Sequence, residues 1–202
     1  MAIERPKIDG VVLMDGFRYS DQRGEVEVPF AAPAFKHETG HDPFMIQQTI
    51  VTRSRRGAVR GVHYTATPPG TAKLVHCVQG QVLDVAVDLR VDSPTFGEWT
   101  AIELSEEDTV TVCLPVGIGH LWIARTEGAT LHYLLSAPYS ADRERAIHPA
   151  DPELNLPLPP VEERLVSERD GSAPTLRDAR AACLLPDLAA CAAALRAMEP
   201  SR

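Results

Sequence analysis

Two cations and a histidine lie close together in the sequence, on either side of a turn rich in proline and glycine. They are Arg60, His63 and Lys73, and the turn between them contains Pro68-Pro-Gly70. If a strand precedes the turn and another follows it, all three side chains can point into one cavity. A cationic cavity suits an anionic ligand or an anionic transition state. A solvated hairpin with a hydrogen-bonded histidine is the alternative, and the spacing alone does not exclude it.

A second histidine, His120, follows the stretch Pro115-Val-Gly-Ile-Gly119. Glycines allow backbone to approach backbone or a ligand closely, so His120 fits either a structural or a functional position. His63 and His120 together could also bind a metal. Such sites typically have an H-x-H pair with a glutamate shortly after, whereas Tyr64 and Thr65 follow His63. Without clustered ligands, the sequence favours a site without a metal.

Tyr133, Tyr139 and Asp170 each allow two interpretations. Tyr133 and Tyr139 are two of only four tyrosines, and Tyr133 lies in an expected strand, where an aromatic residue ordinarily packs in the core. The pair Arg169-Asp170 lies in an expected loop, where a surface ion pair is the plain explanation. Alternatively, Asp170 orients a histidine, as carboxylates do in hydrolase triads. Sequence spacing cannot decide between these alternatives.

The elements that must position these residues are predicted to be strands from about residue 11 to residue 135. Gly80 separates the apolar runs Lys73–Val78 and Gln81–Leu89, and further β-rich runs cover 110–114, 121–124 and 129–135. In the second run Leu83 and its alternate neighbours share one face, while Asp84 shares the other with Asp88, which predicts a half-buried strand. Turn signals recur every 8–12 residues or so, a pattern typical of a sandwich or barrel.

The end of the chain is predicted to be helical. Thr175 and Asp178 can cap a helix over residues 176–183, and Pro186 can begin a second helix at its first position. Residues 149–163, rich in Pro, Asp and Glu, predict a connecting loop. We therefore expect one domain over residues 1–202, with a core at about 10–165 and a helical tail at about 172–199.

The net charge, the apolar runs and the cysteines of the chain bear on its partners and its location. The chain has 202 residues and a formal net charge of −8, which disfavours binding to nucleic acid and to anionic membranes. It contains no apolar run as long as the roughly 20 residues of a transmembrane helix and no signal pattern at its start, so a cytoplasmic location is expected. The four cysteines contain no C-x-x-C pair and are expected to be free thiols.

Taken together, these stretches resemble the dTDP-4-dehydro-6-deoxyglucose 3,5-epimerases, also called dTDP-4-dehydrorhamnose epimerases. The similarity covers about residues 10–185. The segments that carry it occur in order: Asp21-Gln-Arg-Gly24, Arg60-Gly-Val-His63, Thr71-Ala-Lys73, Leu83-Asp-Val-Ala-Val-Asp-Leu-Arg90, Ser93-Pro-Thr-Phe-Gly97, Leu114-Pro-Val-Gly-Ile-Gly-His120, Tyr133, Tyr139 and Ser167-Glu-Arg-Asp170. The tail, with Ala173-Pro-Thr-Leu176 and Leu184-Leu-Pro186, resembles the branch that acts in antibiotic deoxysugar pathways.

The resemblance implies a mainly β, cupin-like jelly roll with short C-terminal helices that forms a homodimer and needs no metal or organic cofactor. It implies a dTDP-4-keto-6-deoxyhexose as substrate. His63 is then the catalytic base, Asp170 the carboxylate that pairs with it, and Tyr133 the proton donor. Lys73 stabilises the enolate, and Tyr139 stacks on the thymine.

The remaining positions that the resemblance assigns to substrate contact are Arg23, Gln48, Arg60, His120, Glu144 and Arg169. Arg169 stands where a lysine is common, so its contact geometry is expected to differ. Three further departures concern Val28, Ile50 and Trp122, where glutamate, asparagine and phenylalanine are usual. They leave open whether C3, C5 or both centres are inverted.

Two other functions stay open at this point. One is a catalytically inactive cupin that binds a nucleotide or a partner without turnover; the retained set of His63, Lys73, Tyr133 and Asp170 argues against it, because a pure binder needs no acid–base pair. The other is a metal-dependent cupin oxygenase or isomerase, which the missing H-x-H pattern disfavours.

Overall fold

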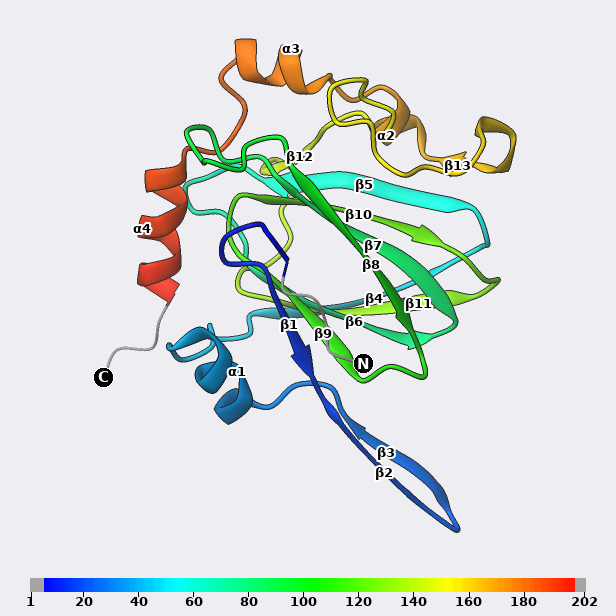
Figure 1. Cartoon of the computed structure of the whole chain (residues 1–202). Coiled ribbons are helices and arrows are strands. Elements are labelled where there is room, and N and C mark those ends of the chain that lie inside the picture. The colour runs from blue at the N-terminus through cyan, green and yellow to red at the C-terminus, as the bar shows by residue number, and fades with distance from the viewer. Residues whose placement is uncertain (1–5, 199–202) are drawn as a thin grey trace.

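Two β-sheets pack face to face as a cupin-like jelly roll in the computed structural model, which describes residues 6–198 (Figure 1). Pairing within both sheets is antiparallel, apart from the short strand β13 (Leu165–Val166), which runs parallel to β5. The five-stranded sheet has the order β1 (Val12–Asp15), β9 (Val110–Leu114), β6 (Lys73–Gln79), β11 (Ala129–Leu135) and β4 (Gln48–Ser54). The six-stranded sheet consists of β12 (Glu144–Ala146), β5 (Ala58–Thr65), β10 (Ile118–Ala124), β7 (Gln81–Asp88) and β8 (Trp99–Ser105), with β13 beside β5.

The main core fills the space between the sheets. Alternate residues of each strand point inward, so that Val75 and Leu131 of one sheet pack in the same buried cluster as Val82 and Ile118 of the other. Each such side chain contributes about 1.5–3 kcal/mol through burial. The same alternation that builds this core directs polar side chains into the cavity described below.

The expected turn at Gly80 between β6 and β7 is confirmed, and it carries the chain from the five-stranded sheet to the six-stranded sheet. The expectation that β7 is half-buried is wrong. Asp84 and Asp88 are both fully buried. The Leu83 face of β7 belongs to a second apolar cluster, closed by Leu154 and Leu176, while Asp84 points between the sheets. Both faces are therefore covered, and alternating polarity here marks a buried polar position rather than a solvent-exposed face.

A β-bulge in β5 sets the direction of two predicted site residues. Arg60 and His63 are three positions apart, and regular alternation would place them on opposite faces. The register with β10 shifts between these two residues, and Gly61 at the bulge has φ +130°. A Cβ on Gly61 would lie 2.4 Å from the carbonyl oxygen of His120. The bulge therefore needs glycine, and it directs both side chains into the cavity.

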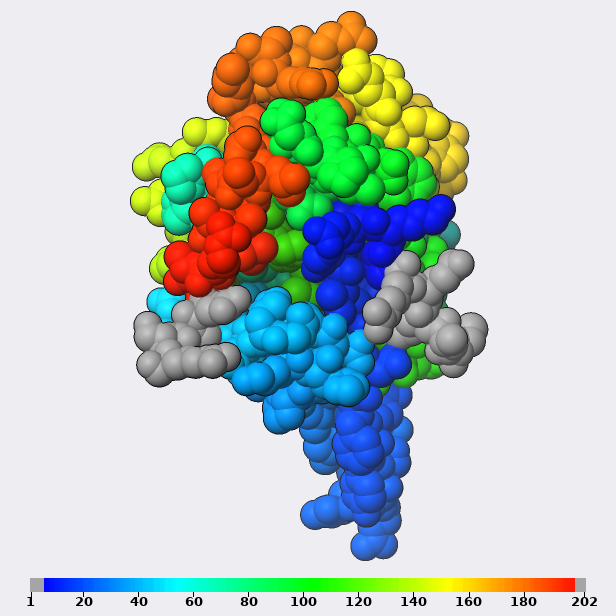
Figure 2. All heavy atoms as spheres, turned by 60° about the vertical axis from the view of Figure 1, so that its left-hand side comes forward, coloured from blue at the N-terminus to red at the C-terminus, as the bar shows by residue number. Residues whose placement is uncertain are grey.

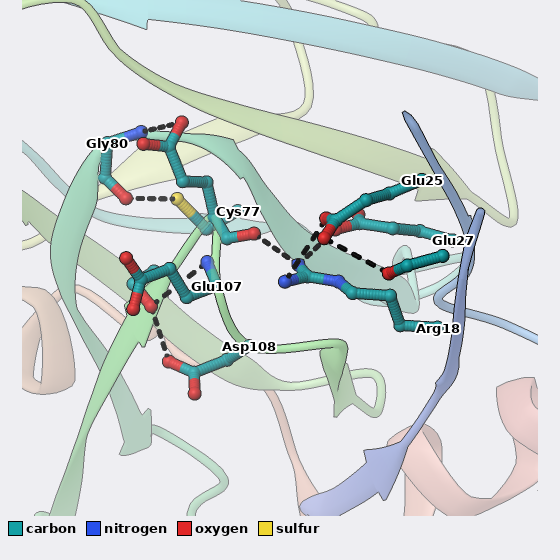
Figure 3. A network of polar contacts seen from close by, with 10 residues as sticks. Arg18, Glu25, Glu27, Cys77, Gly80, Glu107 and Asp108 are labelled. Atoms are coloured by element: carbon teal, nitrogen blue, oxygen red, sulfur yellow. Dashed lines mark hydrogen bonds and ion pairs between the residues drawn. The ribbon is translucent and has the colours of Figure 1, made fainter. Parts of the chain in front are cut away.

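The strands β2 (Phe17–Asp21) and β3 (Gly24–Val28) form a hairpin that projects from the body as an arm (Figures 1 and 2). Arg18 ties the arm to its own body by donating to the carbonyl of Glu106 at 2.5 Å. Within the arm, Arg18 pairs with Glu27 of the neighbouring strand (Figure 3). The opposite face of the arm is apolar and exposed.

Helices pack at the edges of the jelly roll. Helix α1 (Ala32–Thr39) was not predicted from the sequence; it has a proline in its first turn, ends at Gly40 and buries only Phe35. The capped helix after Thr175 is confirmed as α3 (Leu176–Ala181). The last helix, α4 (Leu188–Met198), begins after Asp187 rather than at Pro186, because the Asp187 carboxylate accepts from the Ala190 amide at 2.9 Å.

The connection before these helices is confirmed as mostly irregular over 149–163, with a short 3₁₀ turn (η1, Val161–Glu163), and α2 (Glu168–Gly171) follows it. All four cysteines are free thiols, and Cys77 and Cys113 are buried as expected. Within residues 6–198, no helix has the length and apolar character that crossing a membrane requires.

Candidate active site

A cavity of about 220 Å³ lies between the two sheets and is lined by most of the predicted site residues. The predicted residues that line it are Arg60, His63, Lys73, His120, Tyr133, Tyr139, Glu144 and Arg169. Its remaining walls are formed by Ile50, Thr52, Thr71, Trp122, Leu135 and Ala137. Residues scattered over more than a hundred positions in the sequence thus share one cavity.

His63 and Asp170 form a hydrogen-bonded pair. His63 Nε2 lies 2.7 Å from Asp170 Oδ1, and their side chains are 28% and 4% exposed. The hydrogen bond assigns the proton to Nε2 and leaves Nδ1 as the basic nitrogen. The predicted role of Asp170 as a carboxylate that orients a histidine is geometrically satisfied, because α2 folds back against β5.

The environment of Asp170 keeps it ionised. Burial raises the pKa of its carboxyl group. The hydrogen bond and the charge of His63, together with the backbone amide of Gly61, lower this pKa by more than burial raises it, so the net pKa lies below 3.8. The carboxylate therefore stays charged at neutral pH. In that state it fixes one tautomer of His63 and stabilises the imidazolium that forms when His63 takes a proton.

His120 belongs to a second, more deeply buried pair. Its Nε2 lies 2.6 Å from Asp84 Oδ2, and both side chains are at most 4% exposed. His120 is the cross-strand partner of His63. Sequence reasoning did not identify Asp84 as part of the site. The signal available was a carboxylate alternating with apolar residues in β7, and it was interpreted as a solvent-facing position.

Lys73 enters the cavity from the first position of β6. Burial lowers the pKa of its ammonium group, whereas the charges of Glu144 and Asp84 raise it; the net pKa lies below 10.5. Glu144 is held by the Thr65 hydroxyl, which donates to it at 2.9 Å. The two carboxylates favour the charged form of this half-buried side chain, and in that form its field acts strongly on a nearby oxyanion.

Tyr133 lies on the opposite wall from His63. It belongs to β11 of the five-stranded sheet, whereas His63 belongs to β5 of the six-stranded sheet. Its side chain is 9% exposed, and its ring meets His120 edge-on at a centroid distance of 5.8 Å. Burial, followed by the charge of Asp84, raises the pKa of the phenol. Tyr133 therefore holds its proton firmly until an acceptor forms beside it.

The mouth of the cavity carries the arginines and an exposed aromatic ring. Arg60 donates from Nε to Ser54 Oγ at 2.8 Å and lies over the Trp122 ring at 5.9 Å. Tyr139 is 51% exposed, and its backbone amide donates to Gln48 Oε1 at 2.6 Å. Gln48 thus holds the Tyr139 loop and does not itself line the cavity.

Arg23 is not brought to this cavity. It lies at the tip of the β2–β3 arm with a side chain that is 82% exposed, and it pairs with Asp21 at 2.5 Å. Within a single chain Arg23 therefore lies away from the cavity, because the arm extends away from the body (Figure 2).

The described residues contain no group of three or more His, Cys, Asp or Glu side chains arranged to hold a metal ion. His63 and His120 each use Nε2 to bond a carboxylate. The chemistry that this donor set offers is therefore acid–base chemistry: a base, a phenolic acid, and an ammonium group between two carboxylates.

Comparison with known proteins assigns the family. A model of the family described as dTDP-4-dehydrorhamnose 3,5-epimerase matches residues 5–178. A protein of that name from Mycolicibacterium smegmatis is 41% identical over 174 residues, which are 86% of this chain and 85% of that protein.

Solved structures extend the similarity to the fold. ChmJ of Streptomyces bikiniensis, a 3'-monoepimerase in complex with dTDP-quinovose, is similar with a TM-score of 0.90 and 40% identity, covering 97% of this chain and 98% of that one. NovW of Streptomyces spheroides, a 4-keto-6-deoxy sugar epimerase from the novobiocin biosynthetic gene cluster, has a TM-score of 0.88 and 41% identity, with coverage of 93% and 94%.

Proposed function

The chain belongs to the dTDP-4-dehydrorhamnose 3,5-epimerase family, and from this premise we propose that it epimerises a dTDP-4-keto-6-deoxyhexose beside the C4 ketone. Relatives named as 3-epimerases and as 3,5-epimerases share C3 as a reaction centre, so C3 is the centre proposed here. The observation that carries the proposal is the placement of His63 and Tyr133 on opposite walls of one cavity.

The first step is proton abstraction by His63. A C4 ketone acidifies the C–H bond at C3, and Nδ1 of His63 takes that proton while the C–H electron pair moves into an enolate. The resulting imidazolium is stabilised by the ionised Asp170 at 2.7 Å. General-base catalysis by a positioned side chain typically contributes about 10²–10⁴-fold to the rate.

Negative charge then builds on the C4 oxygen. Lys73 supplies a half-buried ammonium group and His120 a ring held in place by Asp84. Preorganised donors aimed at a developing oxyanion are usually the largest catalytic contribution, and removal of one costs about 10²–10³-fold in rate. Both groups line the cavity that also holds His63 and Tyr133.

Reprotonation from the other face completes the inversion. The Tyr133 O–H bond breaks, a new C3–H bond forms from the enolate electron pair, and a phenolate remains on Tyr133. A base on one sheet and an acid on the other supply opposite faces of the sugar ring, which is the requirement for inversion as opposed to simple exchange.

The nucleotide occupies the mouth of the cavity. Arg60 and Arg169 bind the diphosphate, since arginine forks match phosphate oxygens, and the exposed ring of Tyr139 stacks on the thymine. These local cations explain how a chain with a net charge of −8 attracts an anionic substrate. The setting is cytoplasmic nucleotide-deoxysugar biosynthesis of the kind in which NovW, from an antibiotic gene cluster, takes part.

A homodimer completes the site. The arm exposes Phe17, Tyr19, Val26 and Val28 on one face, at 62%, 54%, 60% and 39%. In the described part of the chain β4 is an outer strand of its sheet, so a second copy's arm can extend the sheet there. Arg23 of the arm then reaches the partner's cavity, which explains its distance from its own.

Solvent-deuterium incorporation tests the function. With dTDP-4-keto-6-deoxyglucose in D₂O, NMR is expected to show deuterium at C3 together with formation of the C3 epimer; deuterium at C5 would add the second centre. No incorporation at either centre would contradict the epimerase proposal and favour an inactive nucleotide-binding protein, and loss of activity on chelation would favour a metal enzyme.

A further inference from the structure

The proposed proton transfer leaves Tyr133 as an anion at a position where an anion is unfavourable. Once its proton is transferred, a phenolate is left in a buried position, and both burial and the charge of Asp84 oppose that anion. Asp84 Oδ1 is itself buried without a hydrogen-bond partner among the described residues. A phenolate that forms there needs hydrogen-bond donors close to its oxygen.

Thr52 offers the first donor. Its hydroxyl oxygen is buried and makes no hydrogen bond within the described part of the chain, an unusual condition for a buried polar atom. Leu131 is the cross-strand partner of Thr52, so Tyr133, two positions further along β11, is its diagonal neighbour on the same face. Both line the cavity, so the unpaired Thr52 hydroxyl lies on the same wall as Tyr133.

Trp122 offers the second donor, from the opposite sheet. It is 2% exposed, lines the same cavity from β10 and also lowers the pKa of Tyr133. An indole nitrogen only donates, so this interaction favours the phenolate over the phenol. The guanidinium of Arg60 lies over the Trp122 ring at 5.9 Å and brings a positive charge to the same side.

We propose that Thr52 and Trp122 form a two-donor cradle for the Tyr133 phenolate that is left after reprotonation of the sugar, an inference that rests on the proposed epimerase function. Before the transfer, the Thr52 hydroxyl is unpaired among the described residues; after the transfer, Thr52 O–H and Trp122 Nε1–H both donate to the phenolate oxygen. These are positioning residues, because they act on the sugar only through Tyr133.

If the cradle acts on the phenolate, substitutions in it slow epimer formation more than C3 exchange, and one experiment measures both rates. With dTDP-4-keto-6-deoxyglucose in D₂O, exchange at C3 reports proton abstraction by His63, and epimer formation reports proton return by Tyr133. A hydrogen bond to a charged group is worth about tenfold or more. We expect Thr52→Val and Trp122→Phe each to slow epimer formation about tenfold, with exchange changed by less than about threefold.

Conservative and matched variants separate this role from packing. Thr52→Ser, which keeps the hydroxyl, is expected to restore epimer formation to within about threefold. Thr130→Val is the control for Thr52, because its hydroxyl donates to the Gly128 carbonyl at 2.8 Å. Trp99→Phe is the control for Trp122, because its indole donates to the Leu154 carbonyl at 2.9 Å. Neither control is expected to change the ratio of the two rates.

A double-mutant cycle with Tyr133→Phe gives the decisive comparison. If the cradle acts on the phenolate, Thr52→Val slows the residual epimer formation of Tyr133→Phe by less than about twofold. An equal loss in both backgrounds, or a parallel loss of exchange and epimer formation in Thr52→Val, would overturn the proposal. A wild-type protein without exchange would instead contradict the epimerase function, so the two failures are distinguishable.

Discussion

His63 and His120 are direct cross-strand partners on β5 and β10, and each bonds a carboxylate of its own, at 2.7 and 2.6 Å. The two pairs differ in exposure: the His63 side chain is 28% exposed and the His120 side chain 4%. The His63 ring is the more accessible of the two to a substrate in the cavity, whereas the His120 ring is enclosed. This asymmetry supports the proposal that His63 is the base.

Asp170→Asn is expected to slow C3 exchange by about 10²–10⁴-fold with little change in fold, because the amide can hold the wrong tautomer of His63. Exchange in D₂O by NMR measures the loss, and binding of dTDP by calorimetry is the control. Because the pKa of Asp170 lies below 3.8, its contribution to stability is present above that pH and is lost only as the pH falls further. If Asp170→Asn exchanged the C3 proton at neutral pH as fast as the wild-type protein does, the role of Asp170 would be contradicted.

Glu144→Gln is expected to move the alkaline limit of activity to lower pH. Lys73 must be charged to stabilise the enolate, burial already lowers its pKa, and the charge of Glu144 raises it. Removal of that charge therefore lowers the Lys73 pKa further, although Asp84 still opposes the shift. The pH profile of kcat/KM between pH 7 and pH 10.5 measures the shift of the alkaline limit. An alkaline limb that stays in place would show that Lys73 does not set this limit.

His76 makes the fold sensitive to acid. It is 8% exposed beside the His132 ring, and burial, followed by the charge of His132, lowers its pKa to about 4. The unfolded chain takes up this proton near pH 6.5, so the stabilisation is complete above that pH and decreases as the pH falls toward 4. We expect a loss of order 2–3 kcal/mol over this interval, and His76→Phe to be less acid-sensitive in urea titrations. An equal acid dependence in both proteins would contradict this.

The arm is expected to set both assembly and affinity. Tyr19 and Val26 are paired across the arm on its exposed apolar face, so replacing both by serine should weaken the dimer in sedimentation velocity. Arg23→Ala should leave the dimer intact and raise KM about tenfold, as expected for loss of a charge-assisted hydrogen bond to the diphosphate. A monomeric wild-type protein with full activity would refute this arrangement.

The sequence predicted the strands well wherever local pattern decides structure. The run 129–135 coincides with β11, and Gly80 turns between β6 and β7 with φ +73°. Helix α1 was missed because it is short and buries a single large residue, Phe35. Its stability comes from tertiary contact rather than from a periodic apolar face.

The site was predicted less completely, for reasons of three-dimensional arrangement. The bulge at Gly61 that aligns Arg60 with His63 leaves no periodic signal, since the spacing of three implies opposite faces. The pairing of His63 with Asp170 depends on a fold that brings together positions 107 residues apart. Asp84 was misjudged because a carboxylate that alternates with apolar residues looks the same in sequence whether it faces solvent or a cavity.

The central claim is that Nδ1 of His63, braced by Asp170, removes the proton beside the ketone. Its most direct test is C3 exchange of dTDP-4-keto-6-deoxyglucose in D₂O by His63→Ala, with binding of dTDP measured in parallel. We expect exchange to fall to the uncatalysed rate while affinity stays within about tenfold, because base and binding groups are largely separate. Exchange that persists near the wild-type rate in a folded, dTDP-binding His63→Ala protein would contradict it.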